Sequence, residues 1–212
     1  MTSHATHQHA HAGHHSGHDA HAHHDLGSLN AMAASATLHC LTGCAIGEVV
    51  GLVVGTAAGL TNAATIAISV ALAFVFGYTL SAMPLLRSGL ALRRALGIVL
   101  VADTLSILTM EVVDNLVVAV VPGAMDAGLV NPTFWVSMAL ALVAAFAAAY
   151  PVNRALLRRG QGHALTHEFH GAEVAAEGWR RLVPAFATTT LAAAVGAFLL
   201  GGLVVSIAER LG

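Results

Sequence analysis

Long apolar stretches alternate with short polar segments along most of this 212-residue sequence. The apolar stretches cover about residues 38–60, 63–83, 96–121, 133–152 and 182–207. Each has about the 20 residues that a helix needs to cross a bilayer core of ~30 Å at ~1.5 Å per residue. The pattern predicts an all-α fold, a polytopic bundle of about five transmembrane helices in one domain at residues 38–207.

Proline marks two of the predicted helix ends. We expect the second helix to close at Met83-Pro84 and the third at Pro122-Gly123, because proline removes a backbone hydrogen bond and clashes with the preceding turn. Between the fourth and fifth spans we expect an interfacial helix at about residues 160–180.

Glycine recurs at every fourth position of the first span, which reads HCLTGCAIGEVVGLVVGTAAGL. The five positions are Gly43, Gly47, Gly51, Gly55 and Gly59. On one helical face this spacing leaves a groove without side chains, where another helix can pack closely. The sequence therefore predicts a glycine zipper, and we expect its groove to admit the third helix.

Composition and charge agree with a membrane protein. Hydrophobic residues make up 57% of the chain and charged residues 9%, whereas soluble domains are about one quarter charged. The arginines gather after the second and fourth spans, so the positive-inside rule predicts a cytoplasmic N-terminus and an external C-terminus. We expect a multi-pass protein of the bacterial inner membrane whose partner is the lipid bilayer and which does not bind nucleic acid. Whether it forms a homo-oligomer is left open.

Four carboxyl groups fall inside the predicted spans. Glu48 lies near the middle of the first span, where an acidic group costs roughly 2.5–3.5 kcal/mol on insertion scales. In the third span Asp103, Met110 and Asp114 fall within about 40° of one another on a helix, and Glu111 lies at the margin of this stripe. We expect these groups to form one site or pathway for protons or cations. The alternative is a protonated polar knot that fixes helix register.

A second set of possible metal ligands lies at the start of the first span: His39, Cys40 and Cys44. Cysteines four residues apart face the same way on a helix, and thiolates are ligands that suit Cu(I). Together with Glu48, Met110, Glu111 and Asp114, they make up a predicted metal site, whereas Asp103 is predicted to be a buried polar residue. Packing of two small apolar side chains is the alternative for the cysteines.

The first 25 residues hold ten of the fourteen histidines. These are His4, His7, His9, His11, His14, His15, His18, His21, His23 and His24. Such a segment cannot bury enough surface to offset its ordering entropy, so we expect a disordered cytoplasmic tail and a lead-in that ends at residue 37. Its imidazoles favour sequestration of Zn(II), Cu(II) or Ni(II). pH-dependent charging, a purification tag and neutral drift are the alternatives.

Three further histidines, His163, His167 and His170, lie within about 60° of one another on one helical face. A His-x-x-x-His pair on a helix chelates Zn(II) or Cu(II), which predicts a second metal-binding face. The alternative is an amphipathic helix whose histidines lie among the lipid headgroups. HEFH is not the HExxH signature, so a metalloprotease is not expected.

Three motifs, HCLTGCAIGEVVG, TMEVVDN and YPVNRALLRRGQGHA, resemble a family of bacterial integral membrane proteins catalogued only as a domain of unknown function. The resemblance covers about residues 37–207 and leaves the histidine tail outside. It implies a multi-span helical membrane domain and supplies no activity. The matching residues are His39, Cys40, Cys44, Glu48, Glu111, Asp114, Asn153, Gly160 and His163.

These features favour a membrane protein that handles a transition metal, copper or zinc, and that is not an enzyme. The tail would collect the metal, and the Cys/Glu/Asp-lined helix interface would bind or pass it. The alternatives are a proton or monovalent cation conduit with histidine-based pH sensing, and a structural membrane subunit. A haem-binding oxidoreductase subunit is weaker, because His39 has few membrane-embedded histidines to pair with.

Overall fold

The computed structural model describes residues 17–159, 178–184 and 186–211, with side chains from Leu29 onward. Its helices are α1 (Gly17–Ala57), α2 (Asn62–Arg87), α3 (Leu92–Val120), α4 (Pro132–Arg158), the 3₁₀ turn η1 (Gly178–Leu182) and α6 (Thr188–Leu211). The described residues contain no strand, and five of the helices are long and apolar enough to cross a membrane. The predicted all-α fold with five spans is therefore confirmed.

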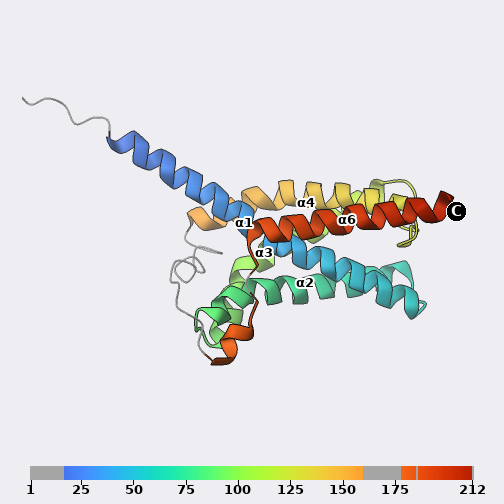
Figure 1. The fold of residues 1–212 in the computed structure, drawn as a ribbon, viewed down its shortest axis with the longest axis horizontal. Coiled ribbons are helices and arrows are strands. Elements are labelled where there is room, and N and C mark those ends of the chain that lie inside the picture. The colour runs from blue at the N-terminus through green and yellow to red at the C-terminus, as the bar shows by residue number, and fades with distance from the viewer. Residues whose placement is uncertain (1–16, 160–177, 185, 212) are drawn as a thin grey trace, which may run out of the picture.

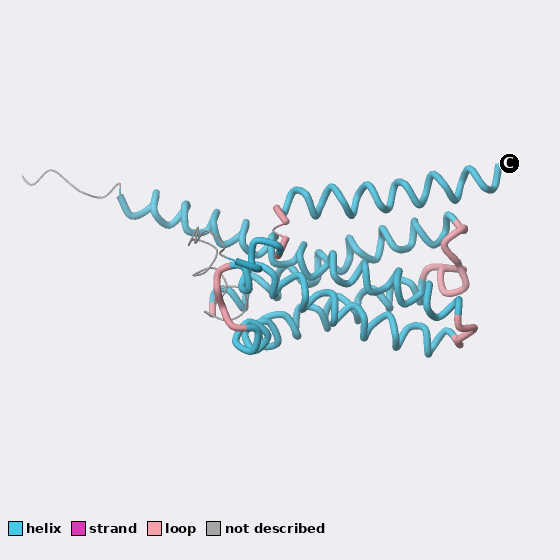
Figure 2. Tube along the Cα trace, turned by 60° about the horizontal axis from the view of Figure 1, so that its bottom comes forward, coloured by secondary structure: helices cyan, strands magenta, loops and turns pink. Residues whose placement is uncertain are grey.

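Helices α1 to α4 form a bundle with antiparallel neighbours, and α6 lies against α4 and α1 on its outside (Figure 1). Figure 2 shows these helices lying side by side, with loops at both ends. One end carries the 88–91 turn, the end of α4 and η1, and there Arg87 donates to the Val183 carbonyl oxygen over 3.2 Å. We call it the arginine end. The opposite end, with the 58–61 turn and the 121–131 loop, is the loop end.

Helix α1 is longer than the sequence predicted. It extends back from the expected start at residue 38, through the lead-in, to Gly17 in the segment expected to form the tail. Residues 1–16 lie outside the described residues. The extension is rich in alanine and contains no proline, and adding turns to an existing helix needs no new nucleus.

Proline ends neither α2 nor α4. Helix α2 runs through Pro84 to Arg87, and α4 runs through Pro151 to Arg158, both beyond their predicted ends. An internal proline removes one backbone hydrogen bond and adds a clash. Leu85, directly after the first of these prolines, is fully buried, so packing of the continuing turn offsets that loss.

Helix α6 begins at Thr188 rather than at residue 182, because η1 and the Val183-Pro184 pair precede it. The residue before a proline is disfavoured in the α region. Near the loop end, α6 packs against Trp135 of α4. Its Nε1 donates to the Leu129 carbonyl oxygen over 2.8 Å, and a Cβ at Gly202 would overlap its ring. Most of the interfacial helix expected at 160–180 lies outside the described residues.

The glycine face of α1 packs against α2. A Cβ at Gly43 or Gly47 would overlap backbone atoms of α2, and one at Gly51 would overlap Ser69. The expectation that this groove admits the third helix is wrong, because the short turn after α1 brings α2 back against it first. Gly59 is not part of the groove: it lies in that turn with a φ of 64°, a conformation that favours glycine.

Candidate functional site

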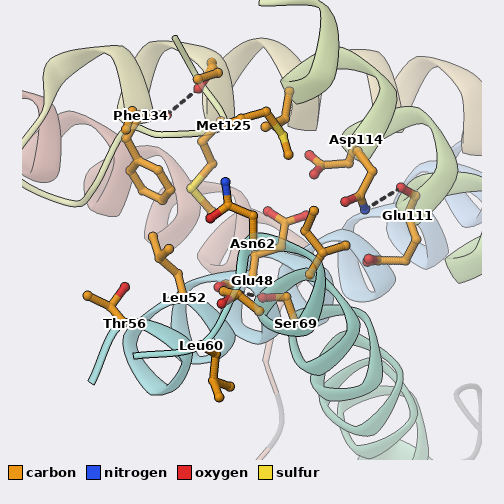
Figure 3. A pocket seen from close by; sticks show the side chains of 18 residues that line it. Glu48, Leu52, Thr56, Leu60, Asn62, Ser69, Glu111, Asp114, Met125 and Phe134 are labelled. Carbon is orange, nitrogen blue, oxygen red and sulfur yellow. Dashed lines mark hydrogen bonds between the residues drawn. The ribbon is translucent and has the colours of Figure 1, made fainter. Parts of the chain in front are cut away.

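A cavity of about 180 Å³ lies among α1, α2, α3 and α4 and is bordered by the loop end (Figure 3). Its polar lining consists of Glu48, Thr56, Asn62, Thr65, Ser69, Glu111, Asp114, Asn115 and Ser137. Two thioethers also line it, Met125 from the 121–131 loop and Met138 from α4. Polar groups at membrane depth face a protein interior or a cavity and usually mark a functional site.

Three carboxyl groups, which we call the cavity carboxyls, meet here: Glu48 of α1, and Glu111 and Asp114 of α3 (Figure 3). The chain brings them together because α1 and α3 run in the same direction on adjacent sides of the bundle. The carboxyls of Glu48 and Asp114 are neighbours that influence each other's charge. Neighbouring carboxylates repel each other, which favours a proton or a cation between them.

Several of these oxygens are buried without a donor. Glu111 is 3% exposed, and neither of its carboxyl oxygens has a hydrogen-bond partner among the described residues. The same holds for Glu48 Oε1 and Asp114 Oδ1. The amide of Asn115 donates instead to the backbone carbonyl of Glu111 over 2.9 Å. Buried oxygens without donors are costly, so a proton or a cation is the partner that this cavity favours.

Sulfur atoms lie directly behind the cavity carboxyls. The Cys44 thiol neighbours the Glu111 carboxyl, and Cys40 lies one turn further along α1. Both cysteines are free and buried, and Met110 and Met138 pack into the same core cluster. A thiol is only a weak hydrogen-bond donor, so it leaves the Glu111 carboxyl without a strong partner.

Asp103 lies apart from the cavity carboxyls. It is fully buried and neighbours Cys40, which also neighbours Ser81 of α2 and Ser106 of α3. We call Cys40, Ser81, Asp103 and Ser106 the inner cluster. It lies further towards the arginine end, because Asp103 precedes Asp114 by three turns of α3.

The predicted histidine ligands are not brought to this site by the described residues. His39 does not line the cavity, and its Nδ1 lies 2.9 Å from the Ser35 carbonyl oxygen of its own helix. His163, His167 and His170 lie outside the described residues. The tail histidines His4, His7, His9, His11, His14 and His15 also lie outside the described residues. His18, His21, His23 and His24 belong to α1, of which only the backbone is described at these positions.

Within the described part of the chain, no group of three or more His, Cys, Asp or Glu side chains has the arrangement of a metal site. A copper or zinc site at Cys40, Cys44 and the cavity carboxyls therefore stays a prediction. The possible ligands lie in two places: the carboxyls line the cavity, and the two thiols belong to the core cluster behind it. The packing of four helices keeps the two sets apart.

Sequence reasoning missed several residues around these groups. Ser81 and Met138 are single polar or polarisable positions inside apolar helices, and no spacing signal separates them from ordinary packing residues. Asn153 of α4, one of the motif residues named from the sequence, donates to the Thr37 hydroxyl over 2.9 Å in the buried core. A polar signal for this pair existed, since an amide inside an apolar span needs a partner, but the partner could not be read from the sequence.

Five helices long and apolar enough to cross a membrane, arranged around a buried polar core, are the architecture of a multi-pass membrane protein. Residues 29–162, more than half of the chain, match the family described as Domain of unknown function (DUF4396), and the chain belongs to that family. The match covers α1 from Leu29 to the end of α4 and not α6, which corrects the expected coverage of 37–207. No curated protein and no solved structure matches the chain.

Proposed function

We propose that this protein handles cations in the membrane by exchanging a proton for a cation at Glu48, Glu111 and Asp114. The observation that carries this proposal is the meeting of Glu48, Glu111 and Asp114 in one cavity, where Glu48 Oε1, Asp114 Oδ1 and both Glu111 carboxyl oxygens are buried without a hydrogen-bond partner among the described residues. These carboxyls hold a proton when the cavity is empty. A cation that enters displaces that proton, because its charge stabilises several carboxylates at once.

Electrostatics explain why the exchange is coupled. Two carboxylates about 4 Å apart repel by about 4 kcal/mol at an effective dielectric constant of about 20. A proton or a cation removes that repulsion, and the two compete for the same oxygens. Binding of the cation is therefore tighter at high pH and releases protons, which lets a gradient of one ion move the other.

The arginines support an orientation for this exchange. Arg87 and Arg154 lie at the arginine end, where Arg154 also donates to Asn30 over 2.7 Å. With that end cytoplasmic by the positive-inside rule, the cavity faces the outside and takes cations from there. The N-terminus and the histidine-rich tail are then cytoplasmic, at the opposite end of the route.

A transition metal, copper or zinc, is the second candidate cargo. It is favoured by the sulfur atoms around the cavity, with Met125 and Met138 in its wall and Cys44 and Met110 behind it. Thiolate and thioether donors select Cu(I) above hard cations. The tail histidines would then serve as a cytoplasmic metal store.

Isothermal titration calorimetry of the full-length protein in detergent tests the proposal. Cu(I), Zn(II) and Na⁺ are each titrated in two buffers of different ionisation enthalpy, so that protons released per bound cation are measured. We expect about one proton released for each cation bound at the cavity, and loss of that binding and release in Glu48→Gln, whereas metal binding by the tail histidines persists. Glu209→Gln, which changes an exposed carboxyl on α6, is the matched control. Wild-type binding in Glu48→Gln would refute the proposed function.

A further inference from the structure

A second pocket lies at the arginine end of the bundle, where the last turns of α4 lie beside α1 (Figure 1). Its volume is about 310 Å³, within the ~300–1,000 Å³ range of ligand-binding pockets. We call it the arginine pocket, and its lining consists of Asn30, Tyr150, Pro151, Arg154, Ala155 and Arg158. None of these residues lines the cavity near the loop end, so the exchange at the cavity carboxyls gives them no role.

Two guanidinium groups of the arginine pocket favour an anionic ligand. Arg154 and Arg158 are four residues apart on α4, so they share one helical face with their Cβ atoms about 5–6 Å apart. Arg154 Nε donates to Asn30 Oδ1 over 2.7 Å, which leaves its four other N–H groups for a ligand. Arg158 makes no hydrogen bond or ion pair with the described residues. Guanidinium groups bind phosphate oxygens through paired hydrogen bonds, so a phosphate between the two arginines suits this arrangement.

The positive charge around the pocket has no described carboxylate beside it. Arg154 pairs with the neutral amide of Asn30, which fixes one edge of the guanidinium without neutralising it. Eight of the nine arginines belong to this end of the bundle: Arg87, Arg93, Arg94, Arg154, Arg158, Arg159, Arg180 and Arg181. The carboxyl side chains that the structure describes lie within the spans or at the loop end: Glu48, Asp103, Glu111, Asp114, Asp126 and Glu209. An anion from outside the chain is therefore the partner that this charge favours.

Tyr150 indicates that the arginine pocket lies at the boundary between hydrocarbon and water. Its ring stacks on Phe146, one turn earlier on α4, with centroids 6.1 Å apart and planes inclined by 22°. A tyrosine with an apolar body and a polar tip is typical of the membrane interface, where the hydroxyl reaches the headgroups. The two arginines follow Tyr150 by one and two turns, towards the water. The pocket is therefore at the depth of the lipid phosphates.

An apolar face of α4 continues from the pocket towards the loop end. Pro151 lines the pocket, and Ala147, Val143 and Leu140 precede it at helical spacing of three or four residues. Val143 is 71% exposed and Leu140 is 53% exposed. In a bilayer this face meets acyl chains, because it lies along a membrane-spanning helix. A phospholipid with its headgroup in the pocket can therefore lay its chains along this face, whereas a soluble phosphate has no such contact.

We infer that the arginine pocket binds the headgroup phosphate of an anionic phospholipid. Arg154 and Arg158 donate to the phosphate oxygens, and the Tyr150 hydroxyl is a further donor at the same depth. Asn30 orients the Arg154 guanidinium and links the bound lipid to α1. A zwitterionic lipid carries a cationic group that the two arginines repel, so the site selects lipids with a net negative charge. The binding site shares no residue with the cavity and does not depend on the proposed function.

Native mass spectrometry of the full-length protein in detergent tests this inference. Phosphatidylglycerol, phosphatidylcholine and glycerol phosphate are each titrated at about pH 8, where the tail imidazoles are neutral and do not attract anions. Phosphatidylglycerol should bind about tenfold or more tighter than phosphatidylcholine, because of its net charge. It should also bind about tenfold or more tighter than glycerol phosphate, which has the same phosphate without acyl chains.

Variants locate the binding in the pocket. Arg154→Gln combined with Arg158→Gln should lower the affinity for phosphatidylglycerol about tenfold or more, because two charged donors are removed. Arg93→Gln combined with Arg94→Gln is the matched control. It removes the same charge from two exposed arginines of the same end outside the pocket, and should stay within about threefold of wild type. Asn30→Asp should cost about threefold or more, since a carboxylate neutralises Arg154.

Four results would overturn the inference. Equal affinity for phosphatidylglycerol and phosphatidylcholine would show that the site does not select charge. Glycerol phosphate that binds as tightly as phosphatidylglycerol would show that the pocket takes a soluble phosphate and not a lipid. Equal loss in the two double variants would show that the total charge of this end, and not the pocket, attracts the lipid. The fourth is wild-type affinity in the pocket double variant. If that variant does not fold, Arg158→Gln changes one exposed side chain in its place, with an expected loss of about threefold or more, and wild-type affinity in it is equally decisive.

Discussion

Replacing Gly47 by alanine tests how α1 meets α2. A Cβ at this position would overlap the backbone of Ala73 and would lie 2.7 Å from the carbonyl carbon of Leu72, whereas ordinary contact begins at 3.4 Å. Backbone atoms cannot rotate away as a side chain can. The two helices must therefore separate by roughly 1 Å over this stretch.

The size of the effect follows from the packing that is lost. A gap of ~0.5–1 Å removes about a quarter to a half of the dispersion energy of each atom pair, which is itself ~0.1–0.2 kcal/mol. Over roughly 40 pairs along the α1–α2 contact this amounts to about 2 kcal/mol. Alanine returns up to about 1 kcal/mol through its higher helix propensity. We expect a net loss of about 1–2 kcal/mol, and a larger loss for Gly51→Leu, which adds a whole side chain against Ser69.

Unfolding by SDS titration in mixed micelles, followed by tryptophan fluorescence, measures this loss. Gly97→Ala is the matched control, because Gly97 is an exposed helical glycine of α3 with nothing within 4 Å of an added Cβ. It should be neutral or stabilised by up to about 1 kcal/mol. If Gly47→Ala is as stable as Gly97→Ala, the close approach of α1 and α2 is wrong, and with it the position of Glu48.

Three further predictions concern the polar core and the tail. Glu111→Gln, alone or combined with Glu48→Gln, should lose no more cation binding than Glu48→Gln alone, because the effects of residues that act as a unit are not additive. Additive losses of binding by calorimetry would contradict one shared site. Thr37→Val should destabilise the bundle by about 1–3 kcal/mol, since it leaves the buried amide of Asn153 unpaired, and wild-type stability in the same SDS titration would contradict that pairing. Deleting residues 1–16 should lower bound Zn(II) or Cu(II) and leave the unfolding curve unchanged; unchanged metal content by elemental analysis would remove the tail as a metal store.

The sequence alone determined the class of fold. Runs of about 20 apolar residues require helices in a bilayer, since only internal hydrogen bonding satisfies the backbone there, and this predicted all five spans. Boundaries were less well determined. Pro84 was expected to stop α2, but burial of Leu85 carries the helix one turn further, and that burial is a tertiary fact.

The candidate site divides in the same way. Sequence patterns identified the costly membrane carboxyls Glu48, Glu111 and Asp114, because an acidic group in an apolar span stands out without a partner. The tertiary structure decided which helix each stripe meets. It placed α2 against the glycines, left the cysteine and carboxyl stripe facing α3 and α4, and separated Asp103 from the cavity. Periodicity defines a helical face but not its neighbour, since the neighbour depends on how all the helices share the available contacts.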